Sequence, residues 1–142
     1  MNDRIKELYK TRILEVAKNP FNEGELEDCT HKIEAYNPLC GDHFHVYLNV
    51  EEGVIEEASF KGYGCAISKA STSVLTRQLK GKSRGEAREL IDLFLELIDS
   101  QSKQSPEAIS QDEELLAFAS ARTFPERLTC ANLAWEEVKR SL

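Results

Sequence analysis

Three cysteines and an aspartate, widely separated along the chain, carry side chains that could bind one metal ion. Cys40 and Asp42 flank Gly41 in a turn that an Asn-Pro pair punctuates, and a curved loop lets both side chains reach one point. Cys65 lies where a strand is expected to end and a helix to begin, and Cys130 lies in the last expected helix. Three thiolates and one carboxylate complete a four-coordinate site of the kind that zinc accepts. A [2Fe–2S] cluster also takes four protein ligands, so the donor types leave both alternatives open.

The expected position of Cys65 favours the thiolate form of its side chain. A helix N-terminus offers free N–H groups and positive potential, which lower the pKa of a thiol and make it a better metal ligand or nucleophile. The preceding segment Gly62-Tyr63-Gly64 leaves the sulfur approachable. Arg127, three residues before Cys130, adds positive charge beside the last cysteine.

An alternative interpretation treats the cysteines as small buried hydrophobic residues, as free cysteines often are. No Cys-x-x-Cys pair of a zinc ribbon or finger occurs. Two of the three, Cys40 and Cys65, nevertheless lie in glycine-containing turns, where core packing is a poor explanation. Cys29 lies outside the pattern and is interpreted as a strand-edge or surface thiol. His43 and His45 alternate with apolar residues and are assigned to the polar face of a strand, with His43 as a candidate neighbour of the metal site.

Composition and charge narrow the class of protein. The 142 residues are 41% hydrophobic and 30% charged, which is typical of one globular domain, expected to span residues 1–142. A net charge of −7 argues against nucleic-acid binding, because a phosphate backbone requires a basic surface. No apolar run is long enough for a bilayer, and the first six residues lack the apolar core of a secretory signal. We therefore expect a cytoplasmic protein with reduced cysteines and no membrane partner.

The elements that must position these residues follow from the periodicity of apolar side chains. Alternating residues predict a three-stranded antiparallel sheet, and helical spacing predicts that helices pack on one face of it, as an α+β domain. Strands are expected at about Thr30–Tyr36, His43–Val50 and Val54–Lys61, with a hairpin turn at Glu51–Gly53. Helices are expected at about residues 5–18, 65–80, 84–98, 112–122 and 124–142, with a polar loop over 100–110.

Two helix starts carry a capping signal. Ser83 and Glu86 have the spacing of a capping box. Before the last helix, Thr123 is expected to be the N-cap, with Pro125 in the first turn and Glu126 completing a second capping box.

Four segments together resemble the U-type iron–sulfur cluster assembly family, the scaffold proteins related to the N-terminal domain of the nitrogen-fixation U protein. Within that family the sequence is similar to the SUF-system branch. In place of the Leu-Pro-Pro-Val-Lys motif and the His of the other scaffold branch, this chain has Phe124–Thr129, and Ser100–Arg122 resembles an insertion typical of the SUF branch. The four matching segments are Lys18–Gly24, Asn37–Asp42, Phe60–Ser68 and Arg127–Trp135.

The resemblance implies a metal site made of Cys40, Asp42, Cys65 and Cys130, which holds zinc in the SUF branch. It also implies a SUF-type cysteine desulfurase as partner. Cys40 would accept persulfide sulfur, so that the protein is a zinc-dependent sulfurtransferase, and we assign Arg127 to orienting the incoming persulfide or the partner.

The other branch of the family implies a different role for the same four residues. There they hold iron or a nascent [2Fe–2S] cluster, which passes to apo iron–sulfur proteins or a downstream scaffold. Loss of the Pro-Pro motif favours sulfur transfer, and whether the protein is an enzyme stays open between the two roles. A purely structural zinc module ranks last, because the apolar stripes suffice for a core without metal.

Overall fold

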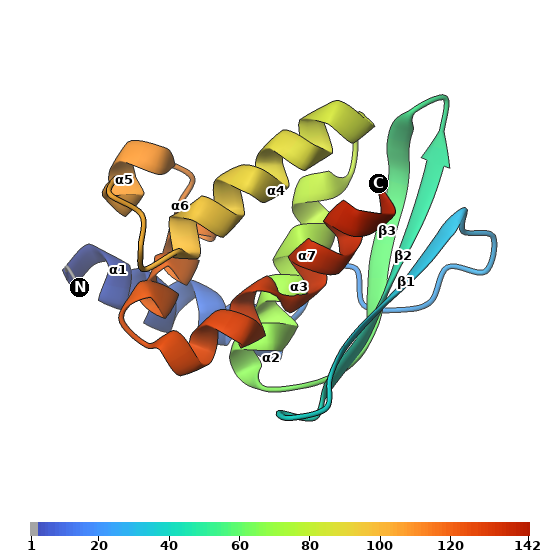
Figure 1. Ribbon diagram of the computed structural model, residues 1–142. Helices are drawn as coiled ribbons and strands as arrows, with labels where there is room; N and C mark the ends of the chain where they lie inside the picture. Colours follow the sequence, from blue (N-terminus) through green and yellow to red (C-terminus); the bar gives the residue numbers. More distant parts are fainter. Residues whose placement is uncertain (1–2) are drawn as a thin grey trace.

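The structure consists of two layers, a twisted three-stranded sheet and a set of helices that lie on one side of it (Figure 1). The computed structural model describes residues 3–142, the side chain of Pro125 excepted. None of the helices in this range is long and apolar enough to cross a membrane. In chain order the elements are α1 (Asp3–Leu8), the π-helical turn η1 (Tyr9–Ile13), α2 (Leu14–Lys18), β1 (His31–Asn37), β2 (Asp42–Glu51), β3 (Val54–Tyr63), α3 (Ala66–Leu79), α4 (Arg84–Ile98), α5 (Pro106–Ile109), α6 (Glu113–Leu116), the 3-10 helices η2 (Ala117–Arg122) and η3 (Pro125–Arg127), and α7 (Leu128–Ser141).

The sheet has the order β1-β2-β3 with both pairs antiparallel, which confirms the predicted α+β class. Asn37 pairs with Asp42, so the loop of residues 38–41 joins β1 to β2. The predicted hairpin turn joins β2 to β3 through Glu52 and Gly53, which have φ angles of 51° and 78°. Two consecutive positive φ angles are the requirement of a type I′ turn, whose twist matches that of the strands.

One residue of the expected polar strand face is buried. Tyr47 is 3% exposed, with the ring of His45 stacked beside it and the ammonium of Lys32 5.9 Å from its ring centroid. Burial, together with the charges of Glu25 and Cys29, raises the pKa of its hydroxyl. The segment between α2 and β1 therefore covers this part of the outer sheet face, which the alternation of residue types alone did not predict.

The N-terminal helix buries the predicted apolar stripe, and its backbone widens at η1. The buried residues Leu8 and Ile13 are five positions apart, a step that would rotate a side chain off one face of a regular α-helix. The π-helical turn accommodates one extra residue and returns Ile13 to the buried side.

Three expectations for the C-terminal third were wrong in detail. The expected loop over 100–110 contains the one-turn helix α5, and the expected helix over 112–122 divides into α6 and η2. The predicted capping box of the last helix does not form, because Thr123 has helical backbone angles (φ −83°, ψ −26°) and donates its N–H to Ser120 as part of η2. An N-cap residue needs an extended backbone. Helix α7 instead begins at Leu128, with Arg127 at the cap position and no side-chain cap.

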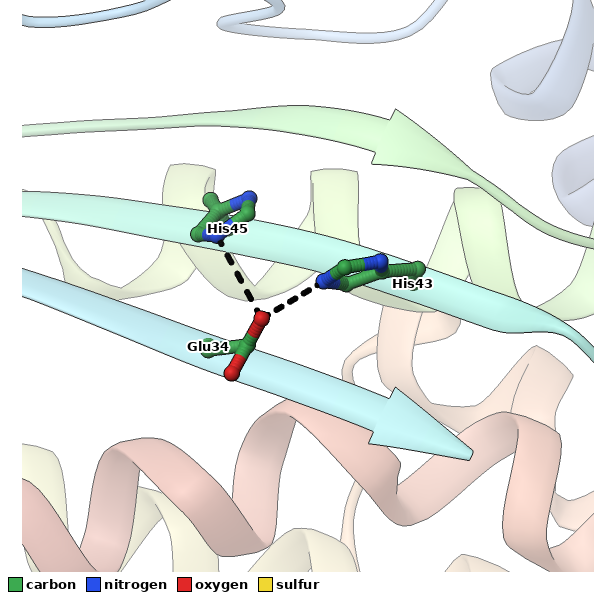
Figure 2. A group of neighbouring side chains, drawn as sticks. All are labelled: Glu34, His43 and His45. Carbon is green, nitrogen blue, oxygen red and sulfur yellow. Dashed lines mark hydrogen bonds and ion pairs between the residues drawn. The ribbon is translucent and has the colours of Figure 1, made fainter. Parts of the chain in front are cut away.

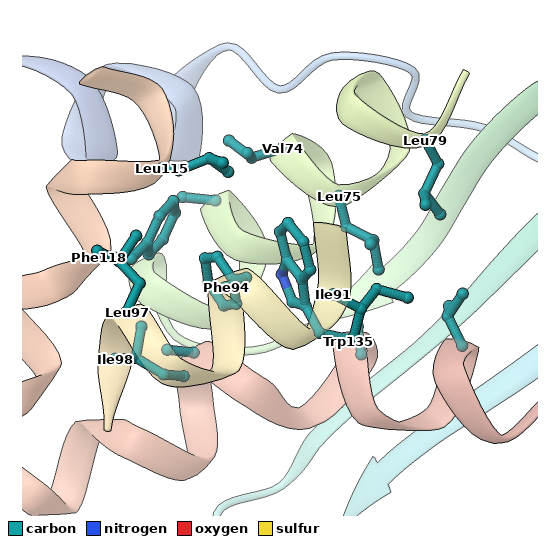
Figure 3. Packing of buried hydrophobic residues seen from close by; sticks show 14 of the residues in the cluster. Val74, Leu75, Leu79, Ile91, Phe94, Leu97, Ile98, Leu115, Phe118 and Trp135 are labelled. Carbon is teal, nitrogen blue, oxygen red and sulfur yellow. The ribbon is translucent and has the colours of Figure 1, made fainter. Parts of the chain in front are cut away.

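The core between the layers fixes α3 against α7. Trp135 of α7 stacks on Phe94 of α4 with ring centroids 3.7 Å apart (Figure 3). Its indole N–H donates to Ser71 Oγ at 2.9 Å, and the Ser71 hydroxyl donates to the carbonyl oxygen of Ala131 at 2.5 Å. Satisfied polar groups in a close-packed core allow little freedom of position, so α3 and α7 have one defined relative placement.

The predicted capping box of α4 is confirmed, and it supplies a test of the local energetics. Ser83 Oγ accepts from the N–H of Glu86 at 3.2 Å, and Glu86 Oε1 accepts from the N–H of Ser83 at 3.0 Å.

Ser83→Ala removes an acceptor for a free helix N–H and should lower the free energy of unfolding by about 1 kcal/mol. Urea denaturation followed by circular dichroism measures the change. Ser100→Ala, at an exposed position after α4, is the matched control and should change it by less than about 0.5 kcal/mol.

Candidate metal centre

Asp42, Cys65 and Cys130 bring three metal-binding atoms together at the end of the helical layer. One carboxylate oxygen and the two Sγ atoms all lie within 4.8 Å of one another. Asp42 begins β2, Cys65 is the N-cap residue of α3, and Cys130 lies in the first turn of α7. The structure thus brings together three of the four residues that the sequence predicted.

One oxygen of the Asp42 carboxylate accepts a hydrogen bond, and the other has no partner among the described residues. Its Oδ1 accepts a hydrogen bond from the N–H of Cys65 at 3.2 Å. Its Oδ2 is buried and has no hydrogen-bond partner among the described residues, and the residue as a whole is 2% exposed. A buried carboxylate oxygen without a partner is costly, and a bound cation would satisfy it. The carboxylate and the two sulfur atoms form a donor set that fits zinc.

Cys65 occupies the helix N-terminus that the sequence predicted. Its Sγ accepts the N–H of Ser68 at 3.4 Å and lies 3.5 Å from the Ser68 hydroxyl oxygen. Burial raises the pKa of the Cys65 thiol, but the hydrogen bonds with Ser68 and Cys130 outweigh burial, so its pKa lies below the usual value. The lowered pKa favours the thiolate, the form in which a cysteine binds metal.

The pKa of the Cys130 thiol shifts in the opposite direction. Burial, the hydrogen bond with Cys65 and the nearby charges of Cys65, Asp42 and Cys40 raise the pKa of its thiol to about 12. Without a cation, Cys130 is therefore the thiol of the pair that keeps its proton more strongly. A bound metal ion supplies the positive charge that lets both sulfur atoms ionise.

Cys40 does not belong to the group of three. It is exposed in the loop of residues 38–41, in which Gly41 has a φ of 78° and donates its N–H to the carbonyl oxygen of Asn37 at 2.8 Å. Its charge contributes to the raised pKa of Cys130, so it lies near the group without joining it. The neighbouring Leu39 is 94% exposed. The fourth predicted donor is thus carried by an exposed turn, beside three donors fixed in the fold.

Arg127, the other residue predicted for the site, is exposed at the start of α7. It lines a cavity of about 400 Å³ together with Ile67, which lies two residues after Cys65. Lys6 and Lys10 from the N-terminal helix line the same cavity, so cationic side chains from distant parts of the chain gather there.

Gly64 is a functional position whose role the sequence did not reveal. A Cβ at this residue would lie 2.6 Å from Asp42 Oδ1 and 2.4 Å from Ser68 Oγ, closer than real contacts allow. The missing side chain lets the backbone before α3 approach the carboxylate. The glycine next to Cys65 was visible in the sequence, but the carboxylate that it must approach is brought there by the tertiary fold. His43, the candidate neighbour of the site, instead bonds to Glu34, and its place on the polar strand face is confirmed.

Comparison with known proteins gives a consistent family. The family model described as the NifU-like N-terminal domain matches residues 8–142. The chain is 33% identical over 139 residues to the iron–sulfur cluster assembly scaffold protein IscU of Streptococcus pyogenes serotype M1, covering 98% of this chain and 85% of the relative. It is 31% identical over 141 residues to the zinc-dependent sulfurtransferase SufU of Bacillus subtilis (strain 168), covering 99% and 93% respectively.

The fold has counterparts among solved structures. The crystal structure of a nitrogen-fixing NifU-like protein (N-terminal) from Brucella abortus superposes with a TM-score of 0.81 at 26% identity. The match covers 97% of this chain and 94% of the other.

Gly64→Ala tests whether the close approach to Asp42 is what forms the centre. The added methyl group displaces the carboxylate, so purified protein should lose most of its bound metal, as measured by elemental analysis. The free energy of unfolding should fall by about 1–3 kcal/mol, since the methyl overpacks a buried site.

Gly85→Ala is the matched control for this variant, because a Cβ there meets nothing within 4 Å. It should retain the metal and lose no stability. Full metal content in the Gly64 variant would show that the centre does not depend on this contact.

Proposed function

This chain belongs to the family of the NifU-like N-terminal domain, and from that premise we propose that it is an iron–sulfur cluster assembly protein of the SUF type. In this proposal it is a zinc-dependent sulfurtransferase that receives persulfide sulfur from a cysteine desulfurase. The observation that carries the proposal is the unpaired, buried Oδ2 of Asp42 beside two thiols, with the exposed thiol of Cys40 near them. The likeness to a relative named as a zinc-dependent sulfurtransferase supports it.

Zinc would be held by Cys65, Cys130 and Asp42, with Cys40 as the fourth ligand. When bound, it keeps the thiols deprotonated and protected from oxidation until the partner docks. Three of these donors come from elements whose relative placement the core fixes. Cys40 lies on a turn that can move without disturbing the sheet or the helices, which makes it the ligand best suited to leave and react.

The proposed reaction is a thiol–persulfide exchange at Cys40. The Cys40 thiolate attacks the terminal sulfur of the persulfide on the desulfurase cysteine. A new S–S bond forms at Cys40 Sγ, the S–S bond of the donor breaks, and the donor cysteine leaves as a thiolate. No external oxidant or reductant is required, because only the terminal sulfur atom moves and one S–S bond replaces another. The sulfur then passes to a downstream scaffold or to apo iron–sulfur proteins.

The surroundings of Cys40 and Arg127 suit the docking of a protein partner. Leu39 is 94% exposed next to Cys40, and Phe124 is 45% exposed near the start of α7. Large exposed apolar side chains near a reactive group are typical of protein interaction sites. The exposed guanidinium of Arg127 would orient the incoming persulfide or an acidic group of the desulfurase. The proposed location is the cytoplasm, where thiols remain reduced.

Replacing Cys40 tests its role as the acceptor. Cys40→Ser should abolish the increase in desulfurase turnover that the unmodified protein gives. It should also remove the mass increase of one sulfur atom at residue 40 after incubation with desulfurase and cysteine. Both losses follow because an alkoxide is not available at neutral pH to attack sulfur. Cys29→Ser is the control and should behave as the unmodified protein, since Cys29 lies outside the centre. Unchanged stimulation by the Cys40 variant would disprove this assignment.

A second candidate function is that of a scaffold on which a [2Fe–2S] cluster is assembled as cargo. The likeness to a relative named as an assembly scaffold favours it, and so does a donor set rich in thiolates.

Metal analysis combined with the visible spectrum separates the two candidates. Sulfur transfer predicts colourless protein with one tightly bound zinc ion, which gains no stable visible chromophore on anaerobic reconstitution with iron and sulfide. A brown protein that transfers its cluster to an apo-ferredoxin would instead establish the scaffold role. The Gly64→Ala variant is the negative control in both cases.

A further inference from the structure

A second group of metal-binding side chains lies on the outer face of the sheet, away from the cysteines. Glu34 of β1 pairs directly with His45 of β2 and lies diagonally opposite His43 (Figure 2). His43 and His45 are two residues apart on one strand, so both side chains point to the same face. Directly opposed and diagonal residues are the pairs whose side chains meet across antiparallel strands.

The three side chains converge on one small region. Glu34 Oε2 lies 2.7 Å from the Nε2 atom of His43 and 3.8 Å from the Nε2 atom of His45. One ligand atom from each residue lies within 4.8 Å of the other two. Ligand atoms that share a tetrahedral zinc ion lie about 3.4 Å apart, because each bond is about 2.1 Å long. The present distances lie on both sides of that value, so small rotations of the two imidazoles complete a site.

Aromatic neighbours hold the imidazole rings in this arrangement. The ring of Tyr36 packs on His43 with centroids 4.8 Å apart, and Tyr47 stacks beside His45 at 6.4 Å. The two imidazoles lie next to each other at 5.2 Å. Ring contacts of this kind restrict side-chain rotation, so little conformational entropy is lost when the three groups bind an ion.

The carboxylate of Glu34 faces two histidines from the neighbouring strand. Both Nε2 atoms face the same carboxylate oxygen, and the two histidine side chains are each only about one third exposed, at 29% and 31%. A shared cation explains why both imidazoles face the carboxylate. We propose that Glu34, His43 and His45 bind one divalent first-row transition-metal ion.

The donor set defines the chemical class of the ion. Two imidazole nitrogens and one carboxylate oxygen suit Zn²⁺, Ni²⁺, Co²⁺ or Fe²⁺, whereas Mg²⁺ and Ca²⁺ prefer sites made of oxygen atoms. Three protein ligands leave positions for water, and the face is open to solvent. The ion is therefore exchangeable, unlike one held by the buried thiols.

This site shares no ligand with the cysteine centre. Asp42 and His43 are neighbours on β2, but successive side chains of a strand point to opposite faces. Asp42 is buried toward the helices, whereas His43 bonds to Glu34 on the outer face. The inference consequently does not depend on the proposed function.

Calorimetric titration with Zn²⁺ tests the proposal. The full chain is first equilibrated with one equivalent of Zn²⁺ and then titrated with more, and we expect one further ion to bind per chain. His45→Gln and Glu34→Gln should each weaken this second binding at least about tenfold, because even groups outside the coordination shell alter affinity by that factor. His31→Gln is the matched control. It replaces the remaining histidine, which bonds to Thr30 near the start of β1, and it should leave the second binding unchanged.

A second measurement uses the unmodified protein, so that the result does not depend on how the variants fold. Imidazole ¹⁵N resonances of His43 and His45 should shift at the Nε2 atoms when the second equivalent of Zn²⁺ is added, and those of His31 should not. Absence of a second binding event would overturn the proposal. So would equal weakening by His31→Gln, or equal binding of Mg²⁺, which would indicate general attraction of cations to an acidic protein.

Discussion

The packing of α3 against α7 is the constraint on which the cysteine centre depends. Cys65 caps one helix and Cys130 lies in the first turn of the other, so the distance between their sulfur atoms follows from how the helices meet. Ser71 bonds to the carbonyl of Ala131 and to the indole of Trp135, and the stacked aromatic rings behind them exclude alternative packing. The donors thus converge because the close-packed core beside them fixes how the two helices meet.

The centre combines a rigid part with an adaptable one. Burial of Asp42 is unfavourable while its second oxygen is unpaired. Favourable packing in the rest of the fold offsets this free-energy cost and keeps the carboxylate in place. The pKa of the Cys65 thiol is lowered and that of the Cys130 thiol is raised, so the two sulfur atoms differ in how readily they ionise. Cys40 remains on an exposed turn. Holding an ion and presenting a reactive sulfur are therefore tasks of different parts of the chain.

Local patterns predicted most of the fold, and tertiary contacts explain the remainder. Alternation placed the strands to within two residues, and the Ser83–Glu86 capping box formed as predicted because both of its hydrogen bonds are local. The similar pattern at Thr123 failed, since that residue is the C-cap of the preceding 3-10 helix and has helical backbone angles. For the site, residue spacing could not supply the ligand set without the family resemblance. The contact between Gly64 and Asp42 was not predictable, because it joins a loop to a strand more than twenty residues away.

The strand β2 carries one donor set on each face, with Asp42 turned inward and His43 and His45 turned outward. A shift of this strand by a single position would exchange the two faces and dismantle both sets of ligands together. Insertions or deletions within its first residues should therefore be far less tolerated than changes of length in the segment around α5, where no donor is carried. The alternating geometry of one strand thus makes both donor sets depend on a single register.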